Sequence, residues 1–285
     1  MTPSTDAVLG CIVGGAIGDC IGGLAEQNRL CLSDDTQLTL ATCEAICASG
    51  EVSPDQIAAA FLRWFRAGRI SGIGSATLKA LCDLRAGAHW ALAGARGERA
   101  AGNGAAMRIA PLAFLLDDRD RSDRAKIRDV CRITHHSDEA YVGALAILAA
   151  IRWPVWAPEP KFFENLATVL PDTRVRDRLA EYSEVSWDTE YSVVAKRFGC
   201  SGYVVESIPL ALFGAIGMAI NGFELTLAEI ARCGGDADTI GSLAGQVAGA
   251  HLGLARLPGR LVDLAPVQEV LPVAASFARR VVRKS

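Results

Sequence analysis

Apolar residues recur three and four positions apart along most of the chain, which is the spacing of one face of an α-helix. The segment that opens with Ser53-Pro54-Asp55 shows this clearly. Proline is favoured at the first helical position, and Ile57 and Phe61 then share one face. Alternation with a period of two residues, the pattern of a half-buried strand, is scarce. The chain is therefore predicted to be all-α, as a compact multi-helix bundle.

Ten further helices are predicted on the same grounds. They cover Asp6–Ile21, Asp34–Ala48, Gly74–Arg85, Ala105–Leu116, Arg121–Ile133, Ser137–Ile151, Val204–Ile220, Leu225–Arg232, Thr239–Leu252 and Val267–Val282.

Two segments depart from the helical pattern. Trp153 to Pro171 is rich in proline and aromatic residues and is predicted to form a loop over the body of the protein. Asp117 to Asp129 mixes both signs of charge, which favours a solvated loop and helix face over a binding patch. Neither segment is a low-complexity linker, and no internal repeat is present. One domain over residues 1–285 is the simplest interpretation.

Composition narrows the class of protein. Apolar residues make up 51% of the chain and aromatic residues 6%, and the 28 glycines favour closely packed helices. A net charge of −3 argues against a nucleic-acid partner. Nine cysteines, an odd number without a CxxC pair, suggest reduced core residues in a reducing compartment. No signal peptide is expected, and Asp19 interrupts the apolar run from Val8 to Ala25, so a membrane span is not expected either. The expected location is the cytoplasm, and the expected state is a monomer.

Two acidic clusters stand immediately before predicted helices. The first, Ser33-Asp34-Asp35-Thr36, has two interpretations. Serine, aspartate and threonine all satisfy free N–H groups at a helix start, and carboxylates suit its positive end, so helix capping alone explains them. Alternatively, their oxygens bind a metal ion.

The second cluster lies in Gly234-Gly235-Asp236-Ala237-Asp238-Thr239-Ile240-Gly241. Two glycines followed by acids at positions i and i+2 exceed what a helix cap requires. Such acids converge on one cation, and the threonine hydroxyl adds a neutral oxygen. Oxygen ligands suit Mg²⁺ or Mn²⁺ better than zinc. If the clusters meet, four carboxylates are close enough to need cations and to hold two of them.

Two further motifs are candidates for ligand binding. Gly102-Asn103-Gly104 precedes a predicted helix, where open backbone N–H groups favour an anion such as phosphate, although such turns are more often plain loops. Arg108, farther along, either binds a phosphate or pairs with a carboxylate. His135 and His136 are either acid–base groups or structural residues of the next helix.

Taken together, the motifs resemble the ADP-ribosylglycohydrolase family, which includes the dinitrogenase reductase-activating glycohydrolase and the ADP-ribosylarginine and ADP-ribosylserine hydrolases. The matching stretches fall in the family's order and span residues 10 to 253. They are Gly14-Gly15-Ala16-Ile17-Gly18-Asp19 with Glu26, Ser33 to Thr36, Gly72-Ile73-Gly74, Gly102 to Arg108, Thr134 to Ala140 and Gly235 to Gly241.

The resemblance implies an orthogonal helical bundle with two Mg²⁺ or Mn²⁺ ions, and it assigns residues to three roles. The implied metal ligands are Ser33, where the family usually has threonine, with Asp34, Asp35, Asp236, Asp238 and Thr239. The implied ligand-binding residues are Asn103, Gly104, Ala105, Met107 and His136. The implied catalytic residues are Glu26, Asp35 and Asp238.

One departure from the family is clear. Only Gln27 to Leu32 separate Glu26 from Ser33, where many relatives carry a much longer loop that helps to cover the ligand. A more open acceptor pocket is therefore expected. The resemblance implies hydrolysis of the bond between C1 of the distal ribose and an acceptor, in an ADP-ribosylated protein or a small ADP-ribosyl compound. Two rival functions remain: hydrolysis of another ribosyl or nucleotide compound, and a non-catalytic ADP-ribose-binding module.

Overall fold

Helices form almost all the regular structure of the protein, in a computed structural model that describes residues 3–153 and 161–283. This confirms the predicted all-α class. The α-helices are α1 (Thr5–Gln27), α2 (Asp34–Ser49), α3 (Pro54–Arg66), α4 (Ser75–Arg85), α5 (Ala110–Ala113), α6 (Arg121–Arg132), α7 (Asp138–Ile151), α8 (Phe162–Thr168), α9 (Arg174–Tyr182), α10 (Tyr191–Phe198), α11 (Val204–Ile220), α12 (Phe223–Cys233), α13 (Ala237–Leu252), α14 (Gly259–Val262), α15 (Ala265–Gln268) and α16 (Leu271–Val282). The 3₁₀ helices are η1 (Glu98–Ala100), η2 (Asn103–Ala105) and η3 (Leu254–Arg256), and the strands are β1 (Ala95–Arg96) and β2 (His135–His136).

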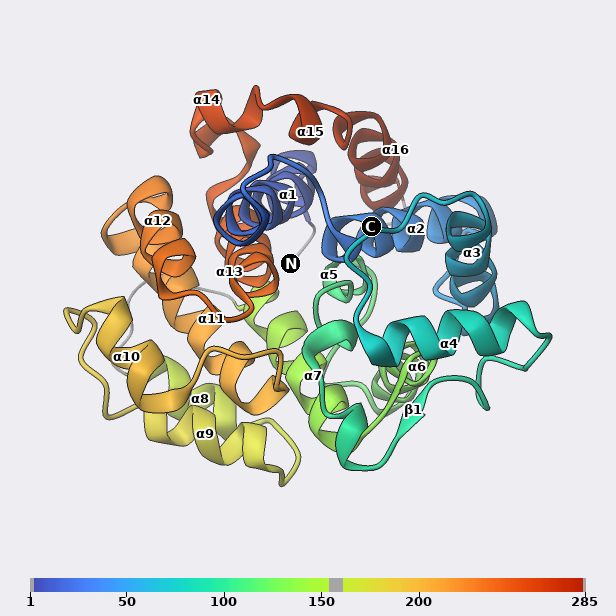
Figure 1. Ribbon diagram of the computed structural model, residues 1–285, viewed down its shortest axis with the longest axis horizontal. Coiled ribbons are helices and arrows are strands. Elements are labelled where there is room, and N and C mark those ends of the chain that lie inside the picture. The colour runs from blue at the N-terminus through green and yellow to red at the C-terminus, as the bar shows by residue number, and fades with distance from the viewer. Residues whose placement is uncertain (1–2, 154–160, 284–285) are drawn as a thin grey trace.

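Helices α1 and α13 form a central antiparallel pair, with α2–α6 on one side, α8–α12 on the other and α14–α16 along one edge (Figure 1). Glycines four residues apart on each helix let the two backbones touch. A Cβ atom added at Gly18 would lie 2.0 Å from the carbonyl oxygen of Gly241, and one at Gly14 would lie 2.4 Å from that of Gly245. Because no side chain fits between the helices, the end of α1 is held directly against the start of α13.

Length and composition alone would let most of α1, Thr5–Glu26, cross a membrane, but 78% of its most apolar stretch is buried inside the fold. An all-round apolar helix of this kind is typical of a protein core as well as of a membrane span. The absence of a span stays a prediction. Among the cysteines, Cys11, Cys20, Cys43 and Cys131 are buried thiols in this core, as expected from their apolar surroundings.

Several predicted helix starts are confirmed by their caps. The hydroxyl of Ser33 accepts a hydrogen bond from the N–H of Asp35 at the start of α2, over 3.2 Å. Ser53 caps α3, which carries Pro54 at its first position, and Ser137 caps α7 in the same way. These hydroxyls satisfy N–H groups that have no partner within the helix.

The continuous helix predicted from Ala105 to Leu116 is wrong. The chain forms the 3₁₀ turn η2, then an irregular stretch, and then the single helical turn α5. Pro111 lacks a backbone N–H and therefore cannot continue a helix ladder through this region. The helix predicted from Val267 to Val282 is likewise divided, into α15 and α16.

The loop predicted from Trp153 to Pro171 is also wrong in part, because Phe162–Thr168 form α8; positions 154–160 lie outside the described residues. Helices α9 and α10 were not predicted. In α9, charged residues between the apolar positions obscure the helical pattern in the sequence. The apolar face is made by Val175, Leu179 and Tyr182, which are buried. In α8, α9 and α10, aromatic residues pack on each other and supply the stability that the short helices lack alone; Tyr182 and Phe198, for example, lie with ring centroids 4.5 Å apart.

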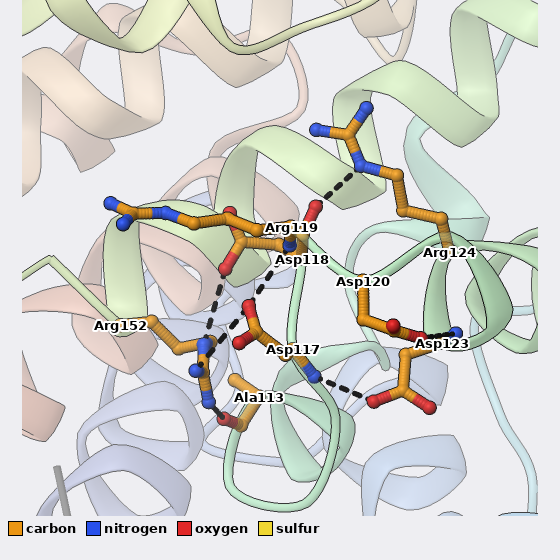
Figure 2. Close-up of polar contacts among 8 residues, drawn as sticks. All are labelled: Ala113, Asp117, Asp118, Arg119, Asp120, Asp123, Arg124 and Arg152. Atoms are coloured by element: carbon orange, nitrogen blue, oxygen red, sulfur yellow. Dashed lines mark hydrogen bonds and ion pairs between the residues drawn. The ribbon is translucent and has the colours of Figure 1, made fainter.

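The charge run from Asp117 to Asp129 is only partly a solvated face. Asp118 is buried, and its carboxylate accepts a 3.1 Å hydrogen bond from Nε of Arg152 (Figure 2). Arg152 also donates to the carbonyl of Ala113 over 3.1 Å, and Arg124 donates to the carbonyl of Asp118. This part of the run is therefore a structural junction between α5, α6 and α7.

Candidate metal centre and ligand pocket

The two acidic clusters predicted from the sequence meet in the structure. Helix α2 begins at Asp34, and helix α13 begins after Asp236. The close pairing of α1 with α13 brings the start of α13 to the later half of α1, and α2 follows α1 after a short link. Thr239 on α13 donates its hydroxyl to the carboxylate of Asp35 on α2 over 3.2 Å, which joins the clusters directly.

Asp19 on α1 is a third part of this arrangement. Its carboxylate is fully buried and accepts hydrogen bonds from the N–H of Ser33 (3.0 Å), the N–H of Thr36 (3.2 Å) and the hydroxyl of Thr36 (2.6 Å). Burial raises the pKa of Asp19 to about 6, although these donors oppose the shift. Asp19 therefore caps α2 from outside the helix and fixes where Asp34 and Asp35 lie.

Asp19, Asp35 and Asp238 each place a carboxylate oxygen within 4.8 Å of the others. In the sequence, Asp19 stands out as an interruption of an apolar run and as part of a glycine-rich motif, without a predicted ligand role. The signal that would have found it is a single acid inside an otherwise apolar, glycine-rich helix, because a lone buried carboxylate needs a partner. The structure identifies these three acids as a group that can hold a metal ion.

The electrostatics of the cluster favour a bound cation. Asp35 is fully buried, and its pKa is raised well above the ordinary value by burial and by the neighbouring carboxylates of Asp19 and Asp238. The same causes raise the pKa of Asp34 to about 8, and burial with Asp236 and Glu26 raises that of Asp238 to about 7. A cation at the centre would offset the repulsion that adds to the effect of burial in these shifts.

Asp236 and Glu26 lie at the edge of the cluster. Asn103 donates its side-chain amide to the carboxylate of Asp236 over 2.6 Å, which links the cluster to the Gly102–Arg108 segment. Glu26 is exposed, and its carboxylate accepts the backbone N–H of Asp238 over 3.1 Å. Glu26 therefore caps the start of α13, where the side chain of the N-cap residue Asp236 makes no capping hydrogen bond.

A cavity of about 280 Å³ opens over the acidic cluster. One wall carries the acids, and the facing walls come from the start of α4, the η2 turn and the loop before α11. The residues that line it are Asp34, Asp35, Gly72, Gly74, Ser75, Ala76, Thr77, Gly102, Asn103, Gly104, Met107, His135, Gly202, Asp236, Asp238 and Thr239. The cavity thus combines an acidic end that can hold a cation with glycine-rich walls.

The predicted ligand-binding residues divide into two sets. Asn103, Gly104 and Met107 line the cavity, whereas Ala105 is buried behind the wall. His136 lies elsewhere: its Nε2 is 2.7 Å from the carbonyl of Ala93, and the neighbouring His135 lines the cavity instead. Successive residues of a strand point to opposite sides, and both histidines belong to β2.

A second cavity, of about 340 Å³, lies at the other end of the α1–α13 pair. Its described lining includes Ser4, Arg152 and His251 and no acidic residue. It therefore lacks the groups that could hold a cation, and the smaller cavity is the better candidate site.

Comparisons with known proteins identify the family of the chain. The sequence model of the ADP-ribosylglycohydrolase family matches residues 1–285. The chain belongs to this family. The ADP-ribosylarginine hydrolase Tri1 of Pseudomonas putida (strain GB-1) is 28% identical to it, across 92% of this chain and 76% of that protein. The ADP-ribosylhydrolase ARH3 of Danio rerio is 27% identical, across 87% of this chain and 83% of that protein. A solved structure named ADP-ribosylglycohydrolase-related protein complex superposes with a TM-score of 0.68 at 25% identity, covering 97% of this chain and 98% of the other.

The residues of this family member fit the divalent cations that the family resemblance implies. Oδ1 of Asp35 is buried and has no hydrogen-bond partner among the described residues, while Oδ2 receives the hydroxyls of Ser33 and Thr239. A buried carboxylate oxygen without a partner is unfavourable unless a ligand occupies it. All the surrounding donor atoms are oxygens, the set that Mg²⁺ and Mn²⁺ prefer.

Proposed function

We propose that this protein is a metal-dependent hydrolase that releases ADP-ribose from an ADP-ribosylated acceptor, by cleaving the bond at C1 of the distal ribose. The observation that carries the proposal is the buried acidic cluster beside the cavity, in which Oδ1 of Asp35 has no hydrogen-bond partner among the described residues. Membership of a family of ADP-ribosyl hydrolases supports the choice of substrate.

Most of the acidic residues at the site would hold cations, and some of these would also accept a proton. Asp34, Asp35, Asp236, Asp238, Ser33 and Thr239 would hold two Mg²⁺ or Mn²⁺ ions, and Asp19 would keep the first pair of acids in place through its hydrogen bonds to α2. Divalent cations supply Lewis acidity, which stabilises negative charge on ribose and water oxygens. The ions are Mg²⁺ or Mn²⁺ because all the donors are oxygens.

The chemical step is a displacement by water at C1, with oxocarbenium character as the bond to the acceptor breaks. Asp35 or Asp238 accepts a proton from the attacking water at a carboxylate oxygen. The leaving group needs a proton unless it already carries one, as an arginine guanidinium does. Glu26 is placed to supply that proton, because it is exposed and lies against the first turn of α13 beside Asp238.

An arginine side chain is the acceptor that the charges at the site favour. Exposed Glu26 lies beside Asp236 and Asp238, which line the cavity, and the three acids attract a cationic acceptor. No residue from Asn28 to Leu32, in the short link after α1, is among those that line the cavity, which supports an acceptor side left open by the link. The arginine-specific name of the Tri1 relative points the same way. We also propose that the protein acts as a cytoplasmic monomer.

The direct test is a release assay with ADP-ribose linked to arginine, to serine and to nucleic acid, with and without chelation. We expect release from the arginine conjugate that requires Mg²⁺ or Mn²⁺. Activity on free nucleosides or nucleotides but on none of the three conjugates would replace this proposal with a different ribosyl hydrolase. Tight ADP-ribose binding without turnover under any of these conditions would replace it with a binding module.

A further inference from the structure

Arg108 is a buried cation that forms no salt bridge with a carboxylate among the described residues. Its guanidinium is fully buried, and Nη2 donates to the hydroxyl of Thr134 over 2.7 Å and to the carbonyl of Val130 over 3.3 Å. Nε and Nη1 have no hydrogen-bond partner among the described residues, and the ring of Phe61 lies 4.7 Å from the guanidinium carbon. Burial lowers its pKa to about 10, so the group stays charged at neutral pH. Arg108 therefore neither lines the cavity nor pairs with an acid, the two roles considered for it from the sequence.

The shorter hydrogen bond of Arg108, to Thr134, is linked through that threonine to a histidine. An arginine side chain only donates hydrogen bonds, so the oxygen of Thr134 accepts in that bond. The same oxygen lies 2.7 Å from Nδ1 of His135. The hydroxyl has a single hydrogen, and Nδ1 is the acceptor within reach. Nδ1 therefore carries no proton, and in a neutral imidazole the remaining proton is on Nε2.

The protonated nitrogen faces the cavity. A Cβ atom added at Gly104 would lie 3.2 Å from Nε2 of His135, and one at Gly102 would lie 3.4 Å from it. Both glycines line the cavity, as His135 does. The missing side chains leave Nε2 accessible from the cavity, whereas the ring nitrogen of His136 is occupied by the carbonyl of Ala93.

The backbone around the histidine is also fixed. Strand β1 pairs in parallel with β2, with Ala95 opposite His135, and the N–H of Ala95 donates to the carbonyl of Thr134 over 3.1 Å. Burial, and after it the charge of Arg108, lowers the pKa of His135 to about 3. The ring is thus held neutral and in one orientation, as a hydrogen-bond donor rather than a proton carrier.

We propose that Arg108 and Thr134 are positioning residues, which hold His135 in its Nε2–H form so that it donates a hydrogen bond to an oxygen of the ligand in the cavity. The ligand oxygen belongs to a phosphate or a ribose hydroxyl, the oxygen-rich groups that such a donor recognises. The identification of that ligand as ADP-ribose rests on the proposed function; the state of the ring does not.

The ring state is tested by ¹⁵N nuclear magnetic resonance of the imidazole nitrogens in the intact protein. The chain has four histidines, so His135→Asn and His136→Asn variants assign the relevant signals. We expect Nδ1 of His135 to be unprotonated and Nε2 protonated throughout the neutral range. A proton on Nδ1 in the wild-type protein would overturn the proposal without any variant.

The chain of hydrogen bonds Arg108–Thr134–His135, here called the relay, is tested with two variants. Thr134→Ser keeps the hydroxyl, and Thr134→Val removes it. Thr226→Val is the matched control, because Thr226 is a buried threonine on α12 whose hydroxyl makes no hydrogen bond among the described residues. Thr134→Val should shift the Nδ1 resonance of His135, and the other two variants should not. An unchanged Nδ1 resonance in folded Thr134→Val would contradict the relay.

Ligand binding is measured separately, by calorimetric titration with ADP-ribose. Thr134→Val should raise Kd about five- to tenfold, as expected for loss of one positioned hydrogen bond. Thr134→Ser and Thr226→Val should stay close to wild type. Equal affinity in Thr134→Val would remove the binding role of His135. If the wild-type protein does not bind ADP-ribose at all, the proposed function fails, while the nitrogen resonances still decide the ring state.

Discussion

The protein contains two acid-rich regions whose buried carboxylates have neighbours of opposite charge. In the junction around Asp118, the buried acid is paired with Arg152, and the adjoining Asp117 also lies within 3.7 Å of that arginine (Figure 2). In the cluster around Asp35, acids face other acids. No arginine or lysine forms a salt bridge with Asp19, Asp34 or Asp35 in the described part of the chain.

The difference separates a structural role from a functional one. A buried acid that has an arginine partner is neutralised within the protein and stabilises the fold or leaves it unchanged. Buried acids that raise one another's pKa are unfavourable for folding, so they indicate a partner from outside the chain. The lack of an arginine or lysine partner among the described residues, more than the number of acids, distinguishes the candidate site.

The largest expected effect is on activity, from substitution within the unpaired cluster. Asp238→Ala or Asp34→Ala should lower ADP-ribose release at least about 100-fold, since even residues that only orient a metal's ligands are worth 10–100-fold. Folding should be little affected, as judged by circular dichroism. The matched control is Asp118→Ala, which should keep its activity per folded molecule. Turnover near the wild-type rate in both cluster variants would remove the site assignment.

The next effect concerns how the cluster is assembled. Gly18→Ala places a methyl group against the carbonyl of Gly241 and should lower the free energy of unfolding by about 2–4 kcal/mol, the upper range for overpacking. Activity should fall with it, because α1 carries Asp19 and α13 carries Asp238. Gly259→Ala is the control, since an added Cβ there meets nothing within 4 Å. Equal denaturant midpoints for the two variants would show that the close helix contact is unimportant.

A smaller effect is expected in the paired region. Asp118→Ala leaves Arg152 without its closest acid and should lower the free energy of unfolding by about 1–3 kcal/mol, because the pair is only partly buried. Urea unfolding monitored by fluorescence measures the change. If this variant instead lost activity while keeping its stability, the contrast between the two regions would be reversed.

The smallest effect is a pH dependence of the metal-free protein. The pKa of Asp34 is raised to about 8 and that of Asp238 to about 7, so the folded protein holds more protons than the unfolded chain between the ordinary acid range and these values. The free energy of unfolding should therefore fall as pH rises through this window, on the order of 1 kcal/mol per pH unit.

Thermal unfolding of the chelated protein between about pH 5 and pH 7 measures this slope. Added Mn²⁺ should flatten it, and so should the double substitution Asp34→Asn with Asp238→Asn. A stability that rises with pH in the chelated wild-type protein would contradict the raised pKa values.

Long amphipathic or apolar helices with clear caps were predictable from the sequence. Helix α7, for example, begins at Asp138 after the Ser137 cap and ends at Ile151, as its apolar run indicates. The end of α1 was placed six residues too early, at Ile21 instead of Gln27. Gly22 and Gly23 favour a helix end, but Gly22 continues the contact with α13, where a Cβ atom would lie 2.4 Å from the backbone of Ala237. Tertiary packing overrides the local preference there.

At the site, the two acidic clusters were predictable because their spacing and position at helix starts are local features. The role of Asp19 was not, since it depends on the link that returns the chain from α1 to α2. The choice between His135 and His136 depends on a two-residue strand, too short to show in the sequence pattern. Arg108 has no local signal for its contact with Thr134, which lies 26 positions away.

The central claim is that the unpaired acids around Asp35 exist to hold divalent cations. Calorimetric titration of the chelated protein with Mn²⁺ tests it most directly, with Asp35→Asn beside Asp118→Asn as the two substituted proteins. The account predicts binding of two ions to the wild-type protein and to Asp118→Asn, and loss of at least one of them in Asp35→Asn. Absence of Mn²⁺ and Mg²⁺ binding to the wild-type protein, or equal binding to all three, would contradict it.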